Sequence, residues 1–294
     1  MPAMSRGVRG TLLTLAGGAL WGLSGTASKY LMATYGMDPL WLSCVRQLGA
    51  CALFLLASVA TAREQLVGVL RSPRDLLAAV VVALTAVLLM QVSYLEAIAW
   101  TNSATATVLQ SLGTIVVLGY SCVRARRRPR MRERVGVALA LAGTFVLATG
   151  GDVRQLAMPP EGLAWGLACA VCNALLSIVP ARLMARWGNF VVNGLTMGVA
   201  GACLSAWVRP WACAPALDGA GAALLVAVVV LGTFGAYALY LQGVRDVGSM
   251  KAILLGTSEP LVATIASIAW LGTAFAPTDL LGFALVIAMV YVAA

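Results

Sequence analysis

The chain of 294 residues contains no histidine and only 11 aspartates and glutamates. Without histidine, metal centres and the common acid–base arrangements of enzymes lose their most frequent participant. Neither an HExxH nor a GxSxG motif occurs, and the acidic residues form no cluster. The sequence therefore argues against an enzyme, and it predicts neither a metal site nor a cofactor.

Charged residues of both signs are also scarce, at 11% of the chain, whereas 61% of the residues are hydrophobic. A soluble domain of this size needs far more charged surface than that. The apolar residues form blocks of about twenty, the length that a helix needs to cross a bilayer. These blocks are apolar on all sides, which is typical of helices in lipid. We therefore predict an all-α integral membrane protein.

The seven cysteines are an odd number and lie mostly inside apolar blocks, so they predict no disulfide framework. Cys169 and Cys172 form a CxxC pair, but both flanks are apolar. We interpret the pair as small packing residues of a helix and not as a redox or metal site.

Short segments with turn or charge signals separate ten apolar blocks, and no loop is long enough to hold a soluble domain. We expect ten transmembrane helices, the first of them an uncleaved helix and not a signal peptide. The blocks fall at about 10–33, 39–60, 76–99, 103–123, 135–150, 162–183, 189–208, 220–243, 248–270 and 278–294.

The net charge of +9 is distributed unevenly along the chain. Alternate loops hold most of the lysines and arginines, including the arginine cluster of residues 124–134, whereas the other loops hold little beyond Lys29, Arg154 and Arg209. By the positive-inside rule the arginine-rich loops are cytoplasmic, which places both termini in the cytoplasm. The charge is thus a topology signal, and nucleic acid is not an expected partner.

An internal repeat is the most informative feature of the sequence. A shift of 146 residues aligns 94–148 with 240–294 without a gap, and Trp21-Gly22-Leu23 matches Trp165-Gly166-Leu167 at a shift of 144. We therefore predict two five-helix repeats, 1–153 and 154–294. Because five is an odd number, the second repeat enters the membrane from the opposite side, as in many transporters. The alternative is that the duplication only made a larger bundle.

Short motifs at matching places extend this interpretation. Besides the two Trp-Gly motifs, they are Arg46 in the second block, Ser103-Ala104-Thr105-Ala106 at the start of the fourth, and Glu259-Pro260-Leu261-Val262 in the ninth. Together with the five-plus-five duplication, they resemble the EamA type of the drug/metabolite transporter superfamily over nearly the whole chain. The chain is most similar to bacterial exporters of aromatic and other neutral amino acids. The resemblance implies a central cavity lined by spans 1, 3, 4, 6, 8 and 9, and a structural pairing for Arg46.

Glu259, in the middle of the ninth block, is the strongest single candidate for a site residue. An ionisable side chain inside a span costs about 2.5–3.5 kcal/mol, so it marks a pathway or a paired structural site. Glu259 could bind a substrate ammonium group, carry a coupling proton, or be a buried carboxyl group paired by a neighbouring helix. Glu96 lies near the end of its block, where a role at the membrane rim is equally compatible, and Lys251 can reach the cytoplasmic interface.

Polar aromatic residues form a second group of candidates. Gln91 and Tyr94 are three residues apart and share a helical face, as do their repeat equivalents Tyr237 and Tyr240. In inverted repeats the two pairs face opposite sides of the membrane, so these tyrosines could line two gates. The alternative is ordinary packing with a hydrogen bond to a nearby carbonyl group.

The remaining candidates are Trp21, whose mid-block position does not suit an interfacial anchor, and the small polar residues Ser24, Ser111 and Asn173. The indole could form an apolar wall, and the polar groups could hydrogen-bond to a substrate or join helices together. Gly18 and Gly22 are spaced for close helix packing.

The leading functional hypothesis is an inner-membrane carrier that exports aromatic or other neutral amino acids by alternating access. The alternatives are export of a different metabolite or drug class and, from another class of protein, a non-transporting membrane scaffold. The expected partners are an amino-acid-like small molecule and membrane lipids. The sequence does not determine the oligomeric state, and it is compatible with a monomer.

Overall fold

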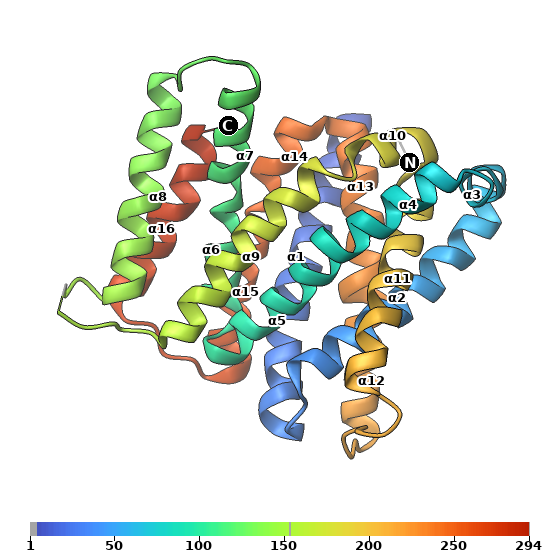
Figure 1. The fold of residues 1–294 in the computed structure, drawn as a ribbon. Helices are drawn as coiled ribbons and strands as arrows, with labels where there is room; N and C mark the ends of the chain where they lie inside the picture. Colours follow the sequence, from blue (N-terminus) through green and yellow to red (C-terminus); the bar gives the residue numbers. More distant parts are fainter. Residues whose placement is uncertain (1–4, 153, 294) are drawn as a thin grey trace.

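The computed structural model describes residues 5–152 and 154–293, and every regular element within them is helical (Figure 1). Residue 153, the last of the first predicted repeat, lies outside these ranges. Seven of the described helical stretches are long and apolar enough to cross a membrane, and α16 is a shorter apolar helix. The chain is thus an all-helical, multi-pass membrane protein.

The first part of the chain, up to the loop at 150–159, forms nine helical elements. They are α1 (Arg6–Tyr35), α2 (Pro39–Thr61), α3 (Arg63–Leu70), α4 (Pro73–Val82), the π-helical turn η1 (Ala83–Leu88), α5 (Leu89–Trp100), α6 (Ser103–Ser111), α7 (Gly113–Arg124) and α8 (Met131–Thr149).

The second part of the chain has a similar series of elements. They are α9 (Pro160–Ile178), α10 (Ala181–Trp187), α11 (Asn189–Val208), α12 (Gly219–Val229), the π-helical turn η2 (Val230–Gly235), α13 (Ala236–Val247), α14 (Ser249–Gly256), α15 (Ser258–Leu271) and α16 (Pro277–Ala293).

The structure corrects one helix boundary and adds two elements. The sixth apolar block, expected to run to residue 183, ends as a helix at Ile178. Pro180 has no N–H to continue the helical hydrogen bonding, so the last backbone bond of this helix is donated by Val179 to the carbonyl oxygen of Leu175. The chain turns there into the short helix α10, and another short helix, α3, follows α2; the apolar pattern predicts neither.

Two kinds of irregularity occur in both parts of the chain. The stretches 73–100 and 219–247 each contain one six-residue π-helical turn. The stretches 103–124 and 249–271 are each interrupted, at Leu112 and at Thr257. Pro260 explains the second interruption, because its nitrogen cannot donate a hydrogen bond to the carbonyl group of Gly256.

The main helix pairs join the first part of the chain to the second. Helix α1 packs against α13 and α15, α9 packs against α5, α6 and α7, α2 packs against α11, and α8 packs against α16. Glycine allows the closest of these approaches: a Cβ atom at Gly22 of α1 would lie 2.5 Å from the backbone oxygen of Glu259 on α15. The space between α1, α5, α9 and α15 is where the candidate site lies.

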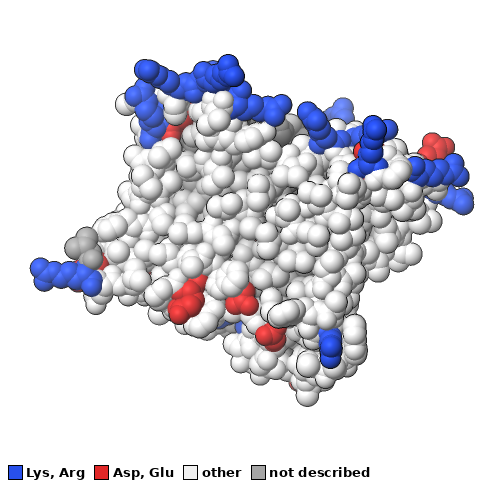
Figure 2. Space-filling view, in the orientation of Figure 1, with Lys and Arg blue, Asp and Glu red and all other residues white. Residues whose placement is uncertain are grey.

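Lysine and arginine side chains gather along one face of the molecule (Figure 2). Helix α1 begins and α16 ends at this face, which we call the arginine-rich face (Figure 1). There the guanidinium group of Arg9 donates to the carboxylate of Asp246 at 2.9 Å, which ties α1 to α13.

At the opposite face a hydrogen bond ties α1 to α12. The Tyr35 hydroxyl donates to Asp218 Oδ1 at 2.7 Å, and the same oxygen accepts from the backbone N–H of Gly221. These two donors hold the pKa of the Asp218 carboxyl group below its usual range, because they stabilise the charged form.

Candidate functional site

A cavity of about 370 Å³ lies inside the bundle, within the range of small-molecule sites. Its walls come from both parts of the chain: α1, α2, α5, α6, α7 and α9, and then α13 to α16. The lining residues include Trp21, Arg46, Met90, Gln91, Tyr94, Gln110, Ser111, Thr114, Asn173, Ser177, Tyr237, Tyr240, Ile253, Thr257 and Glu259.

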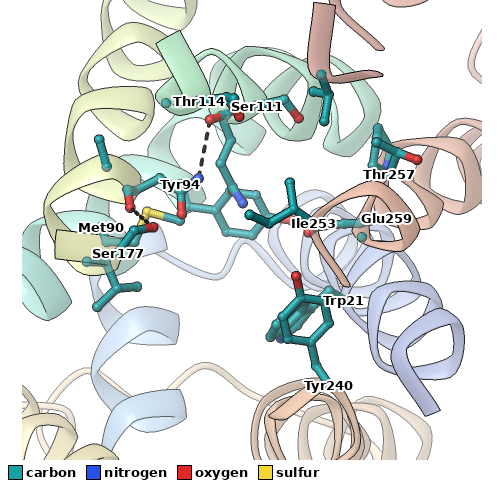
Figure 3. Close-up of a pocket in the computed structure, with 18 of the residues that line it drawn as sticks. Trp21, Met90, Tyr94, Ser111, Thr114, Ser177, Tyr240, Ile253, Thr257 and Glu259 are labelled. Carbon is teal, nitrogen blue, oxygen red and sulfur yellow. Dashed lines mark hydrogen bonds between the residues drawn. The ribbon is translucent and has the colours of Figure 1, made fainter. Parts of the chain in front are cut away.

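Figure 3 shows the arrangement of these side chains: Tyr94, Met90 and Ser177 approach the cavity from one side, and Glu259 and Thr257 approach it from the other. Trp21 and Tyr240 lie together on a third side, below these two groups in this view. Because the polar groups come from different helices, small movements between helices would change the shape of the cavity.

Three aromatic rings form one continuous wall. The Trp21 ring lies 5.0 Å from that of Tyr237 at an interplanar angle of 80°, and 4.9 Å from that of Tyr240 at 46°. Edge-to-face and tilted contacts of this kind fix the rings relative to one another. The wall therefore offers a rigid apolar surface with phenolic hydroxyl groups attached.

The two hydroxyl groups of this wall differ in their partners. Tyr240 donates to the carbonyl oxygen of Ala252 at 3.2 Å, as the packing interpretation expects, whereas Tyr237 makes no side-chain hydrogen bond within the described part of the chain. Tyr94, across the cavity, is only 6% exposed, and its hydroxyl is buried without a partner. A buried hydroxyl without a partner costs about 1–3 kcal/mol, so it favours the arrival of a polar ligand or water.

Glu259 lies in the first turn of α15, where the break at Thr257 starts a new helix inside the bundle. Its carboxylate is half-buried and forms neither a hydrogen bond nor an ion pair with any residue in the described ranges. The N-terminal end of α15 favours a negative charge at this position. The carboxylate thus faces the cavity free to bind a cation or a proton.

Arg46 also lines the cavity, although it is only 4% exposed. Its Nε donates to Thr233 Oγ1 at 3.3 Å and its Nη1 donates to Ser28 Oγ at 3.4 Å. No acidic side chain forms an ion pair with it among the residues described, so its pairing within these ranges is with these two neutral hydroxyl groups.

The structure brings most of the predicted site residues together around this cavity. Ser111 and Asn173 line it, but each also makes a hydrogen bond to a backbone oxygen, of Thr107 and Gln110 respectively. Ser24 does not reach the cavity, because it is buried against Gly232 of η2.

Arg46 and Gln110 are among the lining residues that were not predicted from the sequence. An arginine in the middle of an apolar block was the available signal for Arg46. Nothing in the pattern marks Gln110, which lies at the end of α6 and contacts Cys169. Of the two remaining charged residues, Lys251 is exposed and Glu96 is half-buried, and neither lines the cavity.

The cavity reaches toward the arginine-rich face. Ser177, in the last turn of α9, and Ile253, near the middle of α14, line it and are both exposed. Helix α14 and the short helix α10, which follows α9, lie toward that face (Figure 1). A small molecule can therefore approach the cavity from this side.

Three fully buried hydroxyl groups lie between the cavity and the opposite face. Thr26 on α1 is 2.8 Å from Ser103 on α6, and Ser103 is 3.0 Å from Ser267 on α15. Beside them Lys29 Nζ donates to the carbonyl oxygens of Ile98 and Ala99 at the end of α5. These contacts join α1, α5, α6 and α15 and close this side.

A membrane-spanning helical bundle with an internal cavity, lined by aromatic rings and a few polar groups, is the arrangement expected of a membrane transporter. Comparison with known proteins specifies which kind. The chain belongs to the EamA-like transporter family, whose profile matches residues 8–149 and again residues 160–294.

Two relatives cover nearly the whole chain. An uncharacterized inner membrane transporter of Salmonella typhimurium, YicL, is 30% identical over 282 residues, which are 96% of this chain and 94% of that protein. An uncharacterized transporter of Bacillus subtilis, YwfM, is 25% identical over 94% of this chain and 90% of that protein. A solved crystal structure matches with a TM-score of 0.66 at 20% identity, covering 97% of this chain and 96% of the other, and this likeness concerns the fold alone.

Proposed function

We propose that the protein is a carrier of the bacterial inner membrane that exports small metabolites, foremost aromatic or other neutral amino acids, by alternating access. The cavity carries this proposal: it combines an aromatic wall, unpartnered polar groups and exposed lining residues toward the arginine-rich face. An aromatic surface beside a few polar groups suits a ligand with an apolar body and a polar head.

The proposed architecture is ten transmembrane helices in two inverted repeats, 1–153 and 154–294, with both termini in the cytoplasm. The π-helical turns η1 and η2 support it, because they are separated by almost the same shift that aligns the two sequences. The helix pairs support it too, since exchanging the two halves turns the α1–α13 pair into the α9–α5 pair. The position of the arginines supports a cytoplasmic location for the arginine-rich face.

Alternating access requires a second state in which the opposite face opens. In the proposed cycle the hydroxyl cluster of Thr26, Ser103 and Ser267 separates, while the side of the cavity near Ser177 and Ile253 closes. A cavity between two similar halves permits this, because the halves can rock about it.

Replacement of Ser103 with alanine is expected to favour the state open to the opposite face. The change removes two hydrogen bonds between buried hydroxyl groups, each of about 1 kcal/mol, so the equilibrium shifts by about thirtyfold. The measurement is the reaction of a cysteine at Thr114 with an impermeant thiol reagent added at the periplasmic side, after the exposed Cys203 and Cys213 are replaced with serine.

The matched control is Ser121→Ala, since Ser121 is exposed and bonds only to the carbonyl oxygen of Val117 on its own helix. An equal labelling rate in Ser103→Ala and the control would show that the hydroxyl cluster does not hold this side closed.

Replacement of Trp21 with alanine is expected to remove the preference for aromatic over small neutral amino acids. An aromatic contact contributes about 0.5–1.5 kcal/mol, which predicts about a two- to tenfold loss in the ratio of phenylalanine to alanine transport. The control is Trp207→Ala, because Trp207 is 82% exposed at the end of α11 and far from the cavity lining. An unchanged ratio in Trp21→Ala would remove the indole from the substrate site.

The test of the function is flux of labelled metabolites through the purified protein in liposomes. We expect saturable transport of aromatic amino acids that other neutral amino acids inhibit. Competition by a different metabolite class would assign that class as the substrate. If no tested compound crosses liposomes that contain the protein faster than it crosses empty liposomes, the result supports a non-transporting scaffold.

A further inference from the structure

The guanidinium group of Arg46 is buried without a counter-charge. Its two protein partners are neutral hydroxyl groups at long distances, 3.3 Å for Thr233 and 3.4 Å for Ser28. Its Nη2 makes no hydrogen bond to a residue in the described ranges. Burying a charged group in a low-dielectric interior without a partner is expensive, so this arrangement favours an anion that arrives from outside the protein.

The hydroxyl partners hold the guanidinium group in place without neutralising it. Thr233, in the π-helical turn η2, uses its own proton on the carbonyl oxygen of Val228 in α12, five residues earlier, and Ser28 uses its proton on the carbonyl oxygen of Ser24. Both oxygens therefore have only lone pairs left for Arg46. The fixed fork of the remaining N–H groups is suited to the two oxygens of a carboxylate.

Glu259 is the matching negative group on another side of the same cavity. Both side chains line the cavity, yet they form no ion pair with each other among the described residues. Two opposite charges that share a cavity and stay apart leave room for a ligand between them. Tyr94, with its unpartnered buried hydroxyl, lines the same space.

We propose that Arg46 and Glu259 are the two poles of a site for zwitterions, in which the guanidinium group binds the substrate's carboxylate and the Glu259 carboxylate binds its ammonium group. The inference rests on the proposed transport function and specifies its substrate class. The aromatic wall of Trp21, Tyr237 and Tyr240 then faces the apolar body of the ligand. Compounds that lack either charge leave one pole unpaired and bind less well.

Three ligands of similar shape separate the two poles. L-phenylalanine has both charges, phenylalaninamide keeps only the ammonium group, and 3-phenylpropionate keeps only the carboxylate. For the unmodified protein in liposomes we expect phenylalanine to inhibit uptake of labelled phenylalanine about ten- to hundredfold better than either analogue.

The variants Arg46→Gln and Glu259→Gln test each pole. Arg46→Gln is expected to abolish the preference for phenylalanine over the amide, and Glu259→Gln to abolish its preference over phenylpropionate. Because each result is a ratio within one variant, it does not depend on how much protein folds. Arg46→Lys, which keeps the charge without the fork, is a second variant and is expected to retain part of the preference.

The matched controls remove the same charges away from the cavity: Arg209→Gln at the end of α11 and Glu96→Gln on α5. Both are expected to keep the ratios of the unmodified protein. If phenylalanine is transported but Arg46→Gln and Arg46→Lys keep the unmodified preference over the amide, the two-pole site is overturned while the transport function stands. If the unmodified protein transports no metabolite at all, the proposed function itself fails.

Discussion

Replacement of Glu259 with glutamine is expected to lower transport of zwitterionic substrates about ten- to hundredfold. Glutamate and glutamine side chains have the same shape. The Glu259 carboxylate makes no hydrogen bond or ion pair with the described part of the protein, so the substitution breaks none. The change therefore acts on the ligand and not on the fold. Hydrogen bonds to charged groups contribute about 1.5–3 kcal/mol, which sets the size of the loss.

The same substitution is expected to make the remaining flux independent of a pH gradient. One carboxylate can hold a proton or a substrate ammonium group but not both at once, so each substrate released on one side lets a proton bind in its place. Glutamine can take no proton, and the exchange ends. The measurement is the initial rate of flux with and without an imposed gradient, with Glu96→Gln as the control.

Two results would contradict this role of Glu259. If the Glu259→Gln variant responds to the gradient as the unmodified protein does, another group couples transport to protons. If the unmodified protein ignores the gradient altogether, the carrier is a facilitator and Glu259 serves only in binding.

Replacement of Gly22 with leucine is expected to remove most of the folded protein and all measurable transport. A Cβ atom at this position would meet backbone atoms of α15, the oxygen of Glu259 at 2.5 Å and the nitrogen of Ala263 at 2.9 Å. Backbone cannot move aside as a flexible side chain can, so α15 must separate from α1. Overpacking of this kind costs about 1–3 kcal/mol for small groups and more for a whole side chain.

The position of Gly22 makes the effect larger than a loss of stability. Trp21 is its neighbour in the chain, and Glu259 contributes the very atom that the new side chain would meet. Any protein that still folds would thus have the aromatic wall and the carboxylate displaced relative to each other. We expect Gly22→Ala, with a single added methyl group, to fold in part and to transport poorly.

The matched control is Gly119→Leu on α7. Gly119 is exposed, helical, and has no atom within 4 Å of an added Cβ. In a helix, leucine is more favourable than glycine by up to about 1 kcal/mol. This variant should therefore be as stable as the original protein or slightly more stable. Size-exclusion profiles and flux of the two variants, side by side, measure the difference. Equal profiles for both would show that α1 and α15 tolerate a wider separation.

The sequence predicts the helical stretches well, because the hydrocarbon layer imposes one requirement on all of them. Each apolar block has to satisfy its own backbone hydrogen bonds, and the helix is the way for a single segment to do so. The structure has a helical stretch in each of the ten predicted blocks. What the pattern could not give are the short helices α3 and α10, since at the membrane surface water can satisfy a backbone in any conformation.

The cavity residues were predictable where chemistry alone marks them. Glu259 is an acid in an apolar block and Trp21 is an indole far from the interface, and both line the cavity. Ser24 carries no such mark, because a serine in a helix serves a cavity or a helix contact equally well, and here it packs against Gly232. The direction in which a side chain points depends on neighbours from distant parts of the chain.

The surroundings of Arg46 also depend on other helices and could not be predicted from the sequence. The sequence gives a buried cation, but it does not say whether an acid from another helix lies beside it. The structure supplies the hydroxyl groups of Ser28 and Thr233 instead, and Thr233 is oriented by the π-helical turn η2, an irregularity that no residue type specifies.

The exchange of packing partners between the two parts of the chain bears on how the molecule is made. During synthesis α1, α2, α5 and α8 enter the bilayer before α13, α11, α9 and α16 exist, so their closest neighbours are at first lipid tails. The early helices must therefore be tolerated singly by the membrane, and they reach their final packing only after the second part of the chain has been synthesised. Two separately expressed fragments, divided in the loop at 150–159, should consequently assemble into an active carrier only when one cell makes both.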